Sequence, residues 1–261
     1  KGGAFLDYDA LLDLVTEAGF SLEQSGAEIY RVEESVSRLL VAYGITTGEV
    51  FAIPNCLIVS LTTPSGHSLT RVRRIPPHGT DIFQIEAINS LCRKLCRETP
   101  DYRSARQALE DVRTREPHHA PLTRMLGYFL GAGFFTLFWG GSWIDGLCGG
   151  LCGVAIGLCL TVFTRLGANL FFKTIACGAV SALLALVFSM SGLGQNVDKI
   201  TIGALMVLVP GVALTNAIRD IMEGDMVSGI SKLGEALLVA TAIALGSGLA
   251  LTVARWFGGG A

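Results

Sequence analysis

Residues 146–164 read GLCGGLCGVAIGLCLTVFT, a run without a single Asp, Glu, Lys or Arg. A transmembrane helix needs about 20 predominantly apolar residues. Because charge-free runs of this length are rare in the cores of water-soluble proteins, the run favours a membrane span. Four further runs share the property, at 125–143, 174–193, 200–218 and 236–254. We therefore predict an α-helical polytopic membrane domain of five transmembrane helices over residues 125–261.

Charged residues divide the chain near residue 124. Residues 1–124 carry 14 of the 20 Lys and Arg and 16 of the 22 Asp and Glu, so a water-soluble domain is expected before the membrane domain. The net charge of −2 argues against nucleic acid as a main partner, which would favour a strongly basic face. The 7 cysteines show no metal-ligand spacing. We expect no metal site and no cofactor.

Lysine and arginine in the short loops predict the orientation, because these residues accumulate on the cytoplasmic side of a membrane. Arg165 and Lys173 flank one loop, and Arg219 and Lys232 flank another on the same side. The N-terminus is therefore expected in the cytoplasm and the C-terminus outside.

Glycine recurs at every fourth position of the second run, at Gly149, Gly153 and Gly157. Gly127 and Gly131 repeat the spacing in the first run. Small residues at this spacing let helix backbones approach closely inside a membrane. The pattern predicts a packed bundle or a subunit interface.

The fourth run contains the most polar chemistry, in the stretch VPGVALTNAIRD that ends at Asp220. Pro210 removes a backbone donor and Gly211 weakens the helix, which predicts either a break that opens backbone groups to substrate or a simple kink. Asn216, Arg219 and Asp220 share one side of the following helix. Arg219 is suited to hold a carboxylate, with Asp220 orienting it or exchanging a proton. An interfacial ion pair at the helix end is the alternative.

Two polar residues precede the third run. Asn169 and Lys173 are candidates for the same substrate vestibule. The alternative for Lys173 is that its ammonium group snorkels to the lipid headgroups.

The N-terminal domain has patterns of both helices and strands. Apolar residues follow helical spacing in two stretches before residue 44, and Ser25 with Glu28 fits a capping box that starts the second helix. One long bent helix is the alternative. Alternation and turn residues predict three strands and a final helix, at 49–53, 56–62, 67–75 and 81–97. We expect a small α+β cytoplasmic domain over residues 1–102 and a charged juxtamembrane linker, either a helix or a loop, over 103–124.

Catalytic motifs are missing from the sequence: no nucleophile elbow, phosphate loop or His-Glu metal motif occurs. We therefore predict that the chain is not an enzyme. Glu28, Arg31 and Glu33 crowd one region of the N-terminal domain. A membrane-tethered cytoplasmic hydrolase is kept as an alternative.

The run GAEIYRVE at 26–33 resembles the N-terminal signature of the threonine/serine exporter family. So do TRVRRI at 70–75 and the longer stretch at 208–229, which contains LVPG, TNAIRD and Ser-Gly. The matches cover nearly the whole chain in order. The first of them marks four residues of the cytoplasmic domain as motif residues: Glu28, Tyr30, Arg31 and Glu33.

The resemblance implies a secondary exporter of small carboxylate metabolites in the bacterial inner membrane. The founding substrates of the family are threonine and serine, and one split pair of subunits is associated with succinate export. This chain resembles the larger, N-terminal-half subunit of such a split exporter, which implies a hetero-oligomer with a second membrane subunit. Because five spans place the C-terminus outside, we expect the partner to be an inverted counterpart.

The mechanism that we favour is alternating access without covalent catalysis, with proton motive force as the expected drive. A substrate carboxylate would meet Arg219, with Asn216 and the backbone near Pro210 and Gly211 completing the site, and Asp220 is the candidate coupling group. A scaffold subunit that does not itself transport is the remaining alternative.

Overall fold

The computed structural model describes residues 7–76, 79–114 and 120–257 of the chain. This part forms two compact units. The first unit comprises the described residues before 118 together with 212–233, and the second comprises the rest. The N-terminal domain therefore includes a segment that comes from the apolar half of the sequence.

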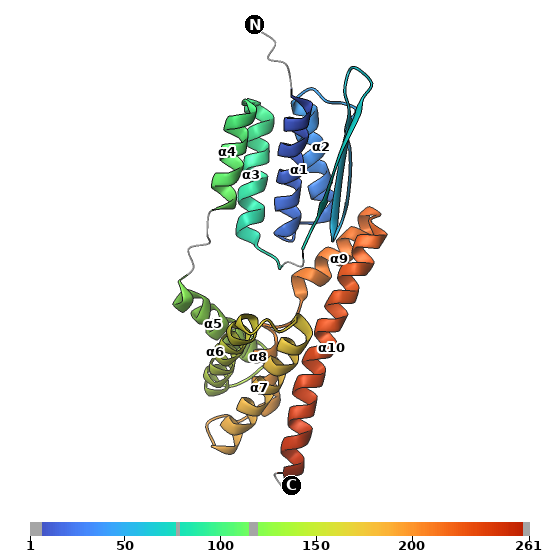
Figure 1. The fold of residues 1–261 in the computed structure, drawn as a ribbon. Coiled ribbons are helices and arrows are strands. Elements are labelled where there is room, and N and C mark those ends of the chain that lie inside the picture. Colours follow the sequence, from blue (N-terminus) through green and yellow to red (C-terminus); the bar gives the residue numbers. More distant parts are fainter. Residues whose placement is uncertain (1–6, 77–78, 115–119, 258–261) are drawn as a thin grey trace. The chain divides into compact units, whose positions relative to one another are not determined.

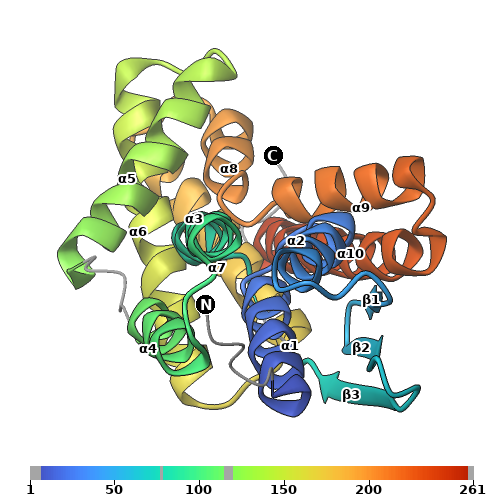
Figure 2. The ribbon, with the colours of Figure 1, turned by 90° about the horizontal axis from the view of Figure 1, so that it is seen from above.

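The N-terminal part of the first unit contains four helices and a three-stranded sheet: α1 (Tyr8–Gln24), α2 (Ile29–Ala42), β1 (Glu49–Ile53), β2 (Cys56–Thr62), β3 (Ser68–Arg74), α3 (Ile82–Glu98) and α4 (Tyr102–Arg113). The antiparallel sheet, in the order β1-β2-β3, packs against α1 and α2. Helices α3 and α4 cover the other side of that helix pair, which gives three layers (Figures 1 and 2).

The sheet buries one face and leaves the other open. Leu57, Val59 and Leu61 alternate along β2, and each is almost completely buried. Successive side chains of a strand point to opposite faces, so these three reach the core while their neighbours face outward. The three predicted strands are confirmed, with β3 one residue shorter at each end than its predicted range.

The predicted two helices before residue 44 are confirmed as α1 and α2, but the connection between them differs from the prediction. Helix α1 ends at Gln24, and Gly26 adopts a φ of +81°, which reverses the chain and excludes one long bent helix. The predicted capping box is also wrong. Ser25 is the C-cap of α1, and Glu28 is the N-cap of α2 without a side-chain capping hydrogen bond. Its carboxylate instead binds two arginines.

The segment predicted as a linker contains α4. Ala105 and Leu109 of this helix are buried in the core of the first unit. The apolar residues of α4 follow helical spacing, but the many charged residues around them make the segment look like a solvent-exposed linker. Residues 115–119 of the predicted linker lie outside the described residues.

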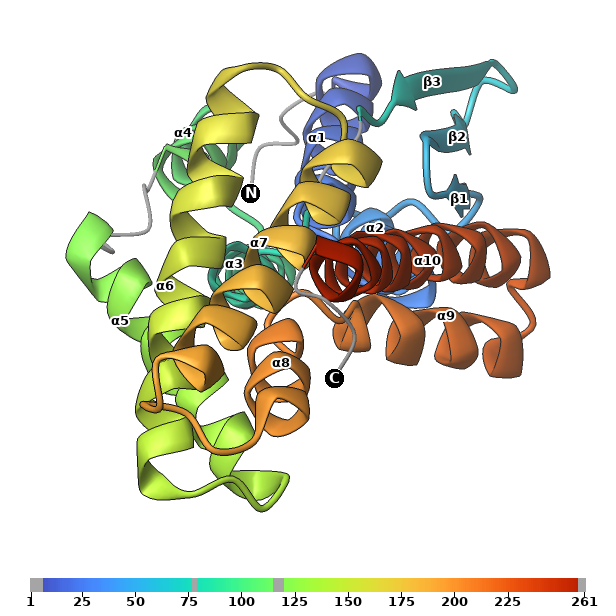
Figure 3. The same cartoon turned by 90° about the horizontal axis from the view of Figure 1, so that it is seen from below.

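The second unit is helical and contains α5 (Pro121–Phe138), α6 (Trp143–Arg165), α7 (Leu170–Met190), α8 (Val197–Leu205) and most of α10 (Met226–Phe257). Helix α9 (Gly211–Glu223), apart from its first residue, and the start of α10 belong to the first unit. Figure 3 shows α8 beside α5, α6 and α7, and these helices share a buried core.

The glycines of α6 lie against α5. A Cβ added at Gly153 would come 2.6 Å from the Cβ of Ala132, and one at Gly157 would come 2.6 Å from the Tyr128 ring. Because contacts of this length do not occur, only glycine permits this helix separation. Gly127 has open space around it, so the closely packed contact of α5 lies further along that helix.

Asp145 fixes the start of α6. It forms a capping box with Ser142, and its carboxylate also accepts the backbone N–H groups of Gln195 (2.7 Å) and Asn196 (3.2 Å). The Asn196 side-chain amide donates to it as well, at 2.9 Å. A fully buried carboxylate thereby ties α6 to the segment before α8.

Three of the described helices are long and apolar enough to cross a membrane: Trp143–Arg165, Leu170–Met190 and Met226–Ala254. Residues 200–218, predicted as the fourth span, are divided between α8 and α9. With 9 residues, α8 is about 14 Å long. This is less than half of the roughly 30 Å hydrocarbon core of a bilayer. The structure confirms a mostly helical chain with a small three-stranded sheet and three candidate membrane spans among the described residues, and the count of five stays a prediction.

Candidate functional site

A helical hairpin, residues 212–233, brings the polar end of the VPGVALTNAIRD stretch into the first unit. The chain reverses at Gly224, which has a φ of +102°. Helix α9 then packs closely on α10, because a Cβ at Gly229 would lie only 2.8 Å from the carbonyl oxygen of Ala217. The hairpin therefore depends on glycine at its turn and at its contact.

Asp220 and Lys232 form an ion pair inside the hairpin. The Lys232 ammonium group donates to Asp220 Oδ2 at 2.8 Å, and Asp220 is fully buried. Its other carboxylate oxygen, Oδ1, accepts no hydrogen bond from the described residues. Asp220 thus pairs with Lys232 and not with its neighbour Arg219, because adjacent residues of a helix point in directions about 100° apart.

Arg219 binds Glu28 at the start of α2. The two oxygens of Glu28 pair with different guanidinium groups, Oε1 with that of Arg219 and Oε2 with that of Arg31. The Arg31 Nε also donates to the Tyr30 hydroxyl at 3.0 Å. The contact joins two of the three motifs that the sequence singled out, and their residues are 191 positions apart.

Glu33 links α2 to the sheet and lies close to the hairpin. Its Oε1 accepts the Ala52 N–H of β1 at 2.8 Å. Burial raises the pKa of Glu33 in spite of this hydrogen bond, and the negative charge of Asp225 raises it further. Burial and Asp220 likewise raise the pKa of Asp225, while Lys232 opposes the shift.

Glu23, near the end of α1, completes a group that we call the carboxyl cluster. Glu23, Asp220 and Asp225 each interact with Lys232, and Glu33 interacts with Glu23 and Asp225. Glu23 is only 1% exposed, and neither of its oxygens has a hydrogen-bond partner among the described residues. Burial raises its pKa to about 8, although Lys232 opposes the shift. Glu23 was not among the predicted site residues, although its position on the apolar side of α1, with Val15 and Gly19, is a usable signal.

The other predicted site residues are more dispersed. Asn216 is half-buried on α9, and Pro210 and Gly211 lie where α8 and α9 are separated. In the second unit, Asn169 is the N-cap of α7 and its side chain accepts the Phe172 N–H at 3.0 Å. Lys173, one turn further along α7, is partly exposed. The roles of these residues in substrate binding stay predictions.

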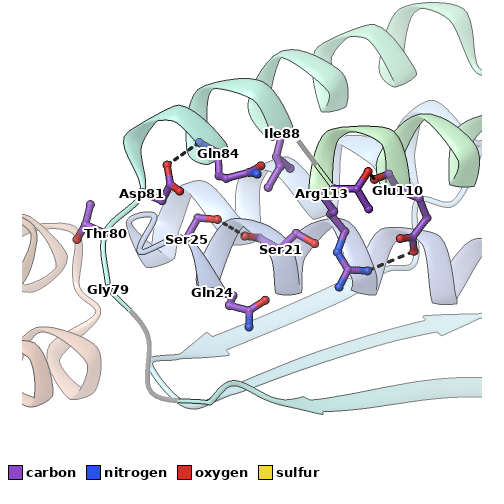
Figure 4. Close-up of a pocket in the computed structure, with 11 residues that line it drawn as sticks. Ser21, Gln24, Ser25, Gly79, Thr80, Asp81, Gln84, Ile88, Glu110 and Arg113 are labelled. Atoms are coloured by element: carbon purple, nitrogen blue, oxygen red, sulfur yellow. Dashed lines mark hydrogen bonds and ion pairs between the residues drawn. The ribbon is translucent and has the colours of Figure 1, made fainter. Parts of the chain in front are cut away.

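A cavity of about 460 Å³ opens between α1, α3 and α4 (Figure 4). Several of its polar groups bind one another. The Ser25 hydroxyl donates to the Ser21 carbonyl, and Arg113 pairs with Glu110. In the described part of the chain no three His, Cys, Asp or Glu residues are arranged to hold a metal ion. Ser25, Glu110 and Arg113 of the cavity lining are thus engaged with other residues of the protein.

A larger groove of about 1,070 Å³ runs between α2 and α3. Four arginines line it against a single acidic residue, Glu34. Two come from α2 and two from α3: Arg31, Arg38, Arg93 and Arg97. Arg31 belongs both to this groove and to the Glu28 ion pairs, so the basic surface continues into the site.

Comparison with known proteins supports the assignment to a transporter family. Residues 13–254 match the family model described as "Putative threonine/serine exporter". A "Probable threonine/serine exporter" of Mycobacterium tuberculosis is 24% identical over 240 residues, which cover 90% of this chain and 45% of that protein. The chain thus spans less than half the length of this relative.

Two shorter relatives match along almost their full length. The "Probable succinate transporter subunit YjjP" of Escherichia coli is 23% identical over 261 residues, and the protein of the same name from Klebsiella aerogenes is 23% identical over 252 residues. In both cases the match covers 94% of each chain. No solved structure matches this chain. Since the family model covers nearly all of the described residues, this chain belongs to the threonine/serine exporter family.

Proposed function

We propose that the chain is a subunit of a secondary exporter for small carboxylate metabolites, either threonine and serine or a dicarboxylate such as succinate. Support comes from the family, from the names of the relatives and from the long apolar helices. The subunit works with a second membrane protein in the inner membrane. Its membrane part crosses the bilayer five times, with the N-terminus in the cytoplasm and the C-terminus outside.

The observation that supports a carboxylate substrate best is the Arg219–Glu28 ion pair. Arg219 already holds a carboxylate, that of Glu28, and its side chain is still 45% exposed. A guanidinium group presents a planar pair of N–H donors that fits any carboxylate. In our proposal the substrate carboxylate takes the place of Glu28 on Arg219, and Arg31 keeps hold of the displaced Glu28.

Asn216 also has a role when the substrate carboxylate replaces Glu28 on Arg219. Asn216 is three residues before Arg219 on α9, so both side chains emerge from nearby positions of the helix. Its amide would select the polar end of the substrate beside the carboxylate. The separation of α8 from α9 at Pro210 and Gly211 leaves α9 able to move without straining α8.

Export by the assembled pair tests the proposal. Inverted membrane vesicles containing the chain and its partner should accumulate labelled succinate, threonine or serine, and vesicles with Arg219→Ala should not, although both proteins assemble. Arg38→Ala is the matched control, because within the described part of the chain Arg38 forms its ion pair with the exposed Glu34. Full export by the partner alone would favour the scaffold alternative. Equal uptake with Arg219→Ala would exclude the proposed binding site.

A further inference from the structure

Glu23 is a buried acid without a hydrogen-bond donor. Its side chain lies in the first unit at the end of α1, and neither oxygen accepts a hydrogen bond within the described ranges. Burying an ionised carboxylate in this way is costly, whereas a protonated carboxyl group is tolerated far better. The geometry by itself therefore favours a proton on Glu23.

The charges that face Glu23 strengthen this preference. Lys232 of α10 is the cation that attracts it, and Glu33 of α2 repels it. The same ammonium group already binds Asp220 of α9 and attracts Asp225 of the hairpin turn. With all four acids ionised, the carboxyl cluster would hold four negative charges against one positive charge.

Cations from the other elements around α1 are bound elsewhere. Arg73 of β3 and Arg113 of α4 both pair with Glu17, and Arg71 of β3 pairs with Asp13. At the start of α3, Asp81 accepts the Gln84 N–H. The electrostatic environment of Glu23 is therefore set by the charges of the hairpin and α2. A proton on one of the acids is the simplest way to neutralise part of their surplus negative charge.

Among the acids of the cluster, Glu23 is the best suited to hold this proton. Asp220 is held by Lys232, and Glu33 by the Ala52 N–H. Burial raises the pKa of Glu23 to about 8, so the carboxyl group is protonated at neutral pH and titrates just above it. Glu23 is thus poised to exchange a proton under physiological conditions.

We infer that Glu23, rather than Asp220, is the residue that binds and releases the coupling proton of this exporter. On release, the O–H bond of the carboxyl group breaks and the proton passes to water. The new carboxylate then competes with Asp220 for the Lys232 ammonium group. Because Lys232 and Asp220 both belong to the hairpin that holds Arg219, protonation of Glu23 is linked to the position of the substrate-binding arginine. This inference rests on the proposed function.

Infrared spectroscopy of the purified full chain tests the proton directly, without any transport. We expect a protonated-carboxyl band that disappears with a midpoint near pH 8, that is lost in Glu23→Gln, and that remains in the control Glu34→Gln. A wild-type protein without such a band, or a band that persists in Glu23→Gln, would overturn the inference. If Glu23→Gln fails to assemble, the infrared titration of the wild-type protein still tests whether a carboxyl group loses its proton near pH 8.

Transport in vesicles with the partner tests the coupling. A group with a pKa of about 8 loses roughly three quarters of its bound proton between pH 6.5 and 8.5, so export should change about fourfold over this range. The pH dependence should vanish in Glu23→Gln and return in Glu23→Asp. An unchanged profile in Glu23→Gln would contradict the coupling role. Absence of any wild-type export would instead contradict the proposed function, whatever the infrared result.

Discussion

Arg219 of α9 and Glu28 of α2 form an ion pair that joins the two motifs most characteristic of the sequence. Glu28 is 10% exposed at its side chain and also pairs with Arg31, so one carboxylate serves two guanidinium groups. The ion pair engages Arg219, the arginine that the sequence predicts to bind the substrate. In the proposed mechanism the substrate carboxylate therefore competes with Glu28 for Arg219.

Replacing Glu28 should make this competition measurable. Glu28→Gln removes the competing charge, and a half-exposed ion pair contributes about 1 kcal/mol, which corresponds to about fivefold in affinity. We expect the KM for the carboxylate substrate to fall about fivefold in the assembled exporter. Glu34→Gln, which breaks only the exposed pair with Arg38, should leave KM unchanged. A higher KM in Glu28→Gln would show that Glu28 supports substrate binding.

The stability of the first unit should depend on pH through Glu23. Its folded pKa of about 8 lies above the ordinary value of 4.5, so the folded state binds the proton more tightly. The contribution of Glu23 is fully present below about pH 4.5 and is lost as the pH rises through 8. Thermal unfolding should show a loss of a few kcal/mol, about 1.4 for each pKa unit of the shift.

Glu23→Gln provides the control for this dependence. Glutamine keeps the shape of the protonated acid and cannot ionise, so the variant should lose less stability between pH 5 and 8.5 than the wild type. The same decline in both proteins would assign the effect to other groups.

Sequence patterns captured local structure well and long-range charge pairing poorly. β1 and β2 were predicted to the residue, because alternation and turn residues are local signals. Helix α10 was placed ten residues too late, since Lys232 and Glu235 look like loop residues in a hydropathy profile. The carboxyl cluster unites α1, α2 and the hairpin, and no local pattern reports which distant charges meet.

Lys232 should stabilise the fold because it neutralises the buried charge of Asp220. Lys232→Met leaves Asp220 buried and unpaired, which should cost about 3–5 kcal/mol of stability. The double variant Asp220→Asn with Lys232→Met removes both charges and should recover most of the loss. Thermal unfolding of the purified chain measures both. If the double variant is as unstable as the single one, packing around Lys232 accounts for the effect and the ion pair does not.

Asp145 should be essential to the second unit. It accepts hydrogen bonds from Ser142, Gln195 and Asn196, so Asp145→Ala removes the buried acceptor of several donors and should cost about 2–4 kcal/mol. Asp198→Ala is the matched control, because Asp198 is an exposed acidic residue in the first turn of α8. Its loss should cost a few tenths of a kcal/mol. Equal melting temperatures for the two variants would contradict this account.

The close contact between α5 and α6 can be tested with two glycine-to-alanine substitutions. Gly153→Ala forces a methyl group onto the Tyr128 carbonyl and the Ala132 side chain, and should cost about 1–3 kcal/mol. Gly127→Ala meets open space and should be neutral or stabilising by about 0.5–1 kcal/mol. Thermal stability in detergent compares the two. A tolerated Gly153→Ala would mean that the helices separate readily.

The hairpin formed by 212–233 has a consequence for how the protein can be dissected. The N-terminal domain is not a continuous module of the gene, because its last structural piece is encoded almost a hundred residues after the rest. A fragment ending at residue 124 would lack Lys232, expose the surface around Glu23, and leave Glu28 without Arg219. Cutting the chain at its apparent border would therefore remove part of the domain that the cut was meant to isolate.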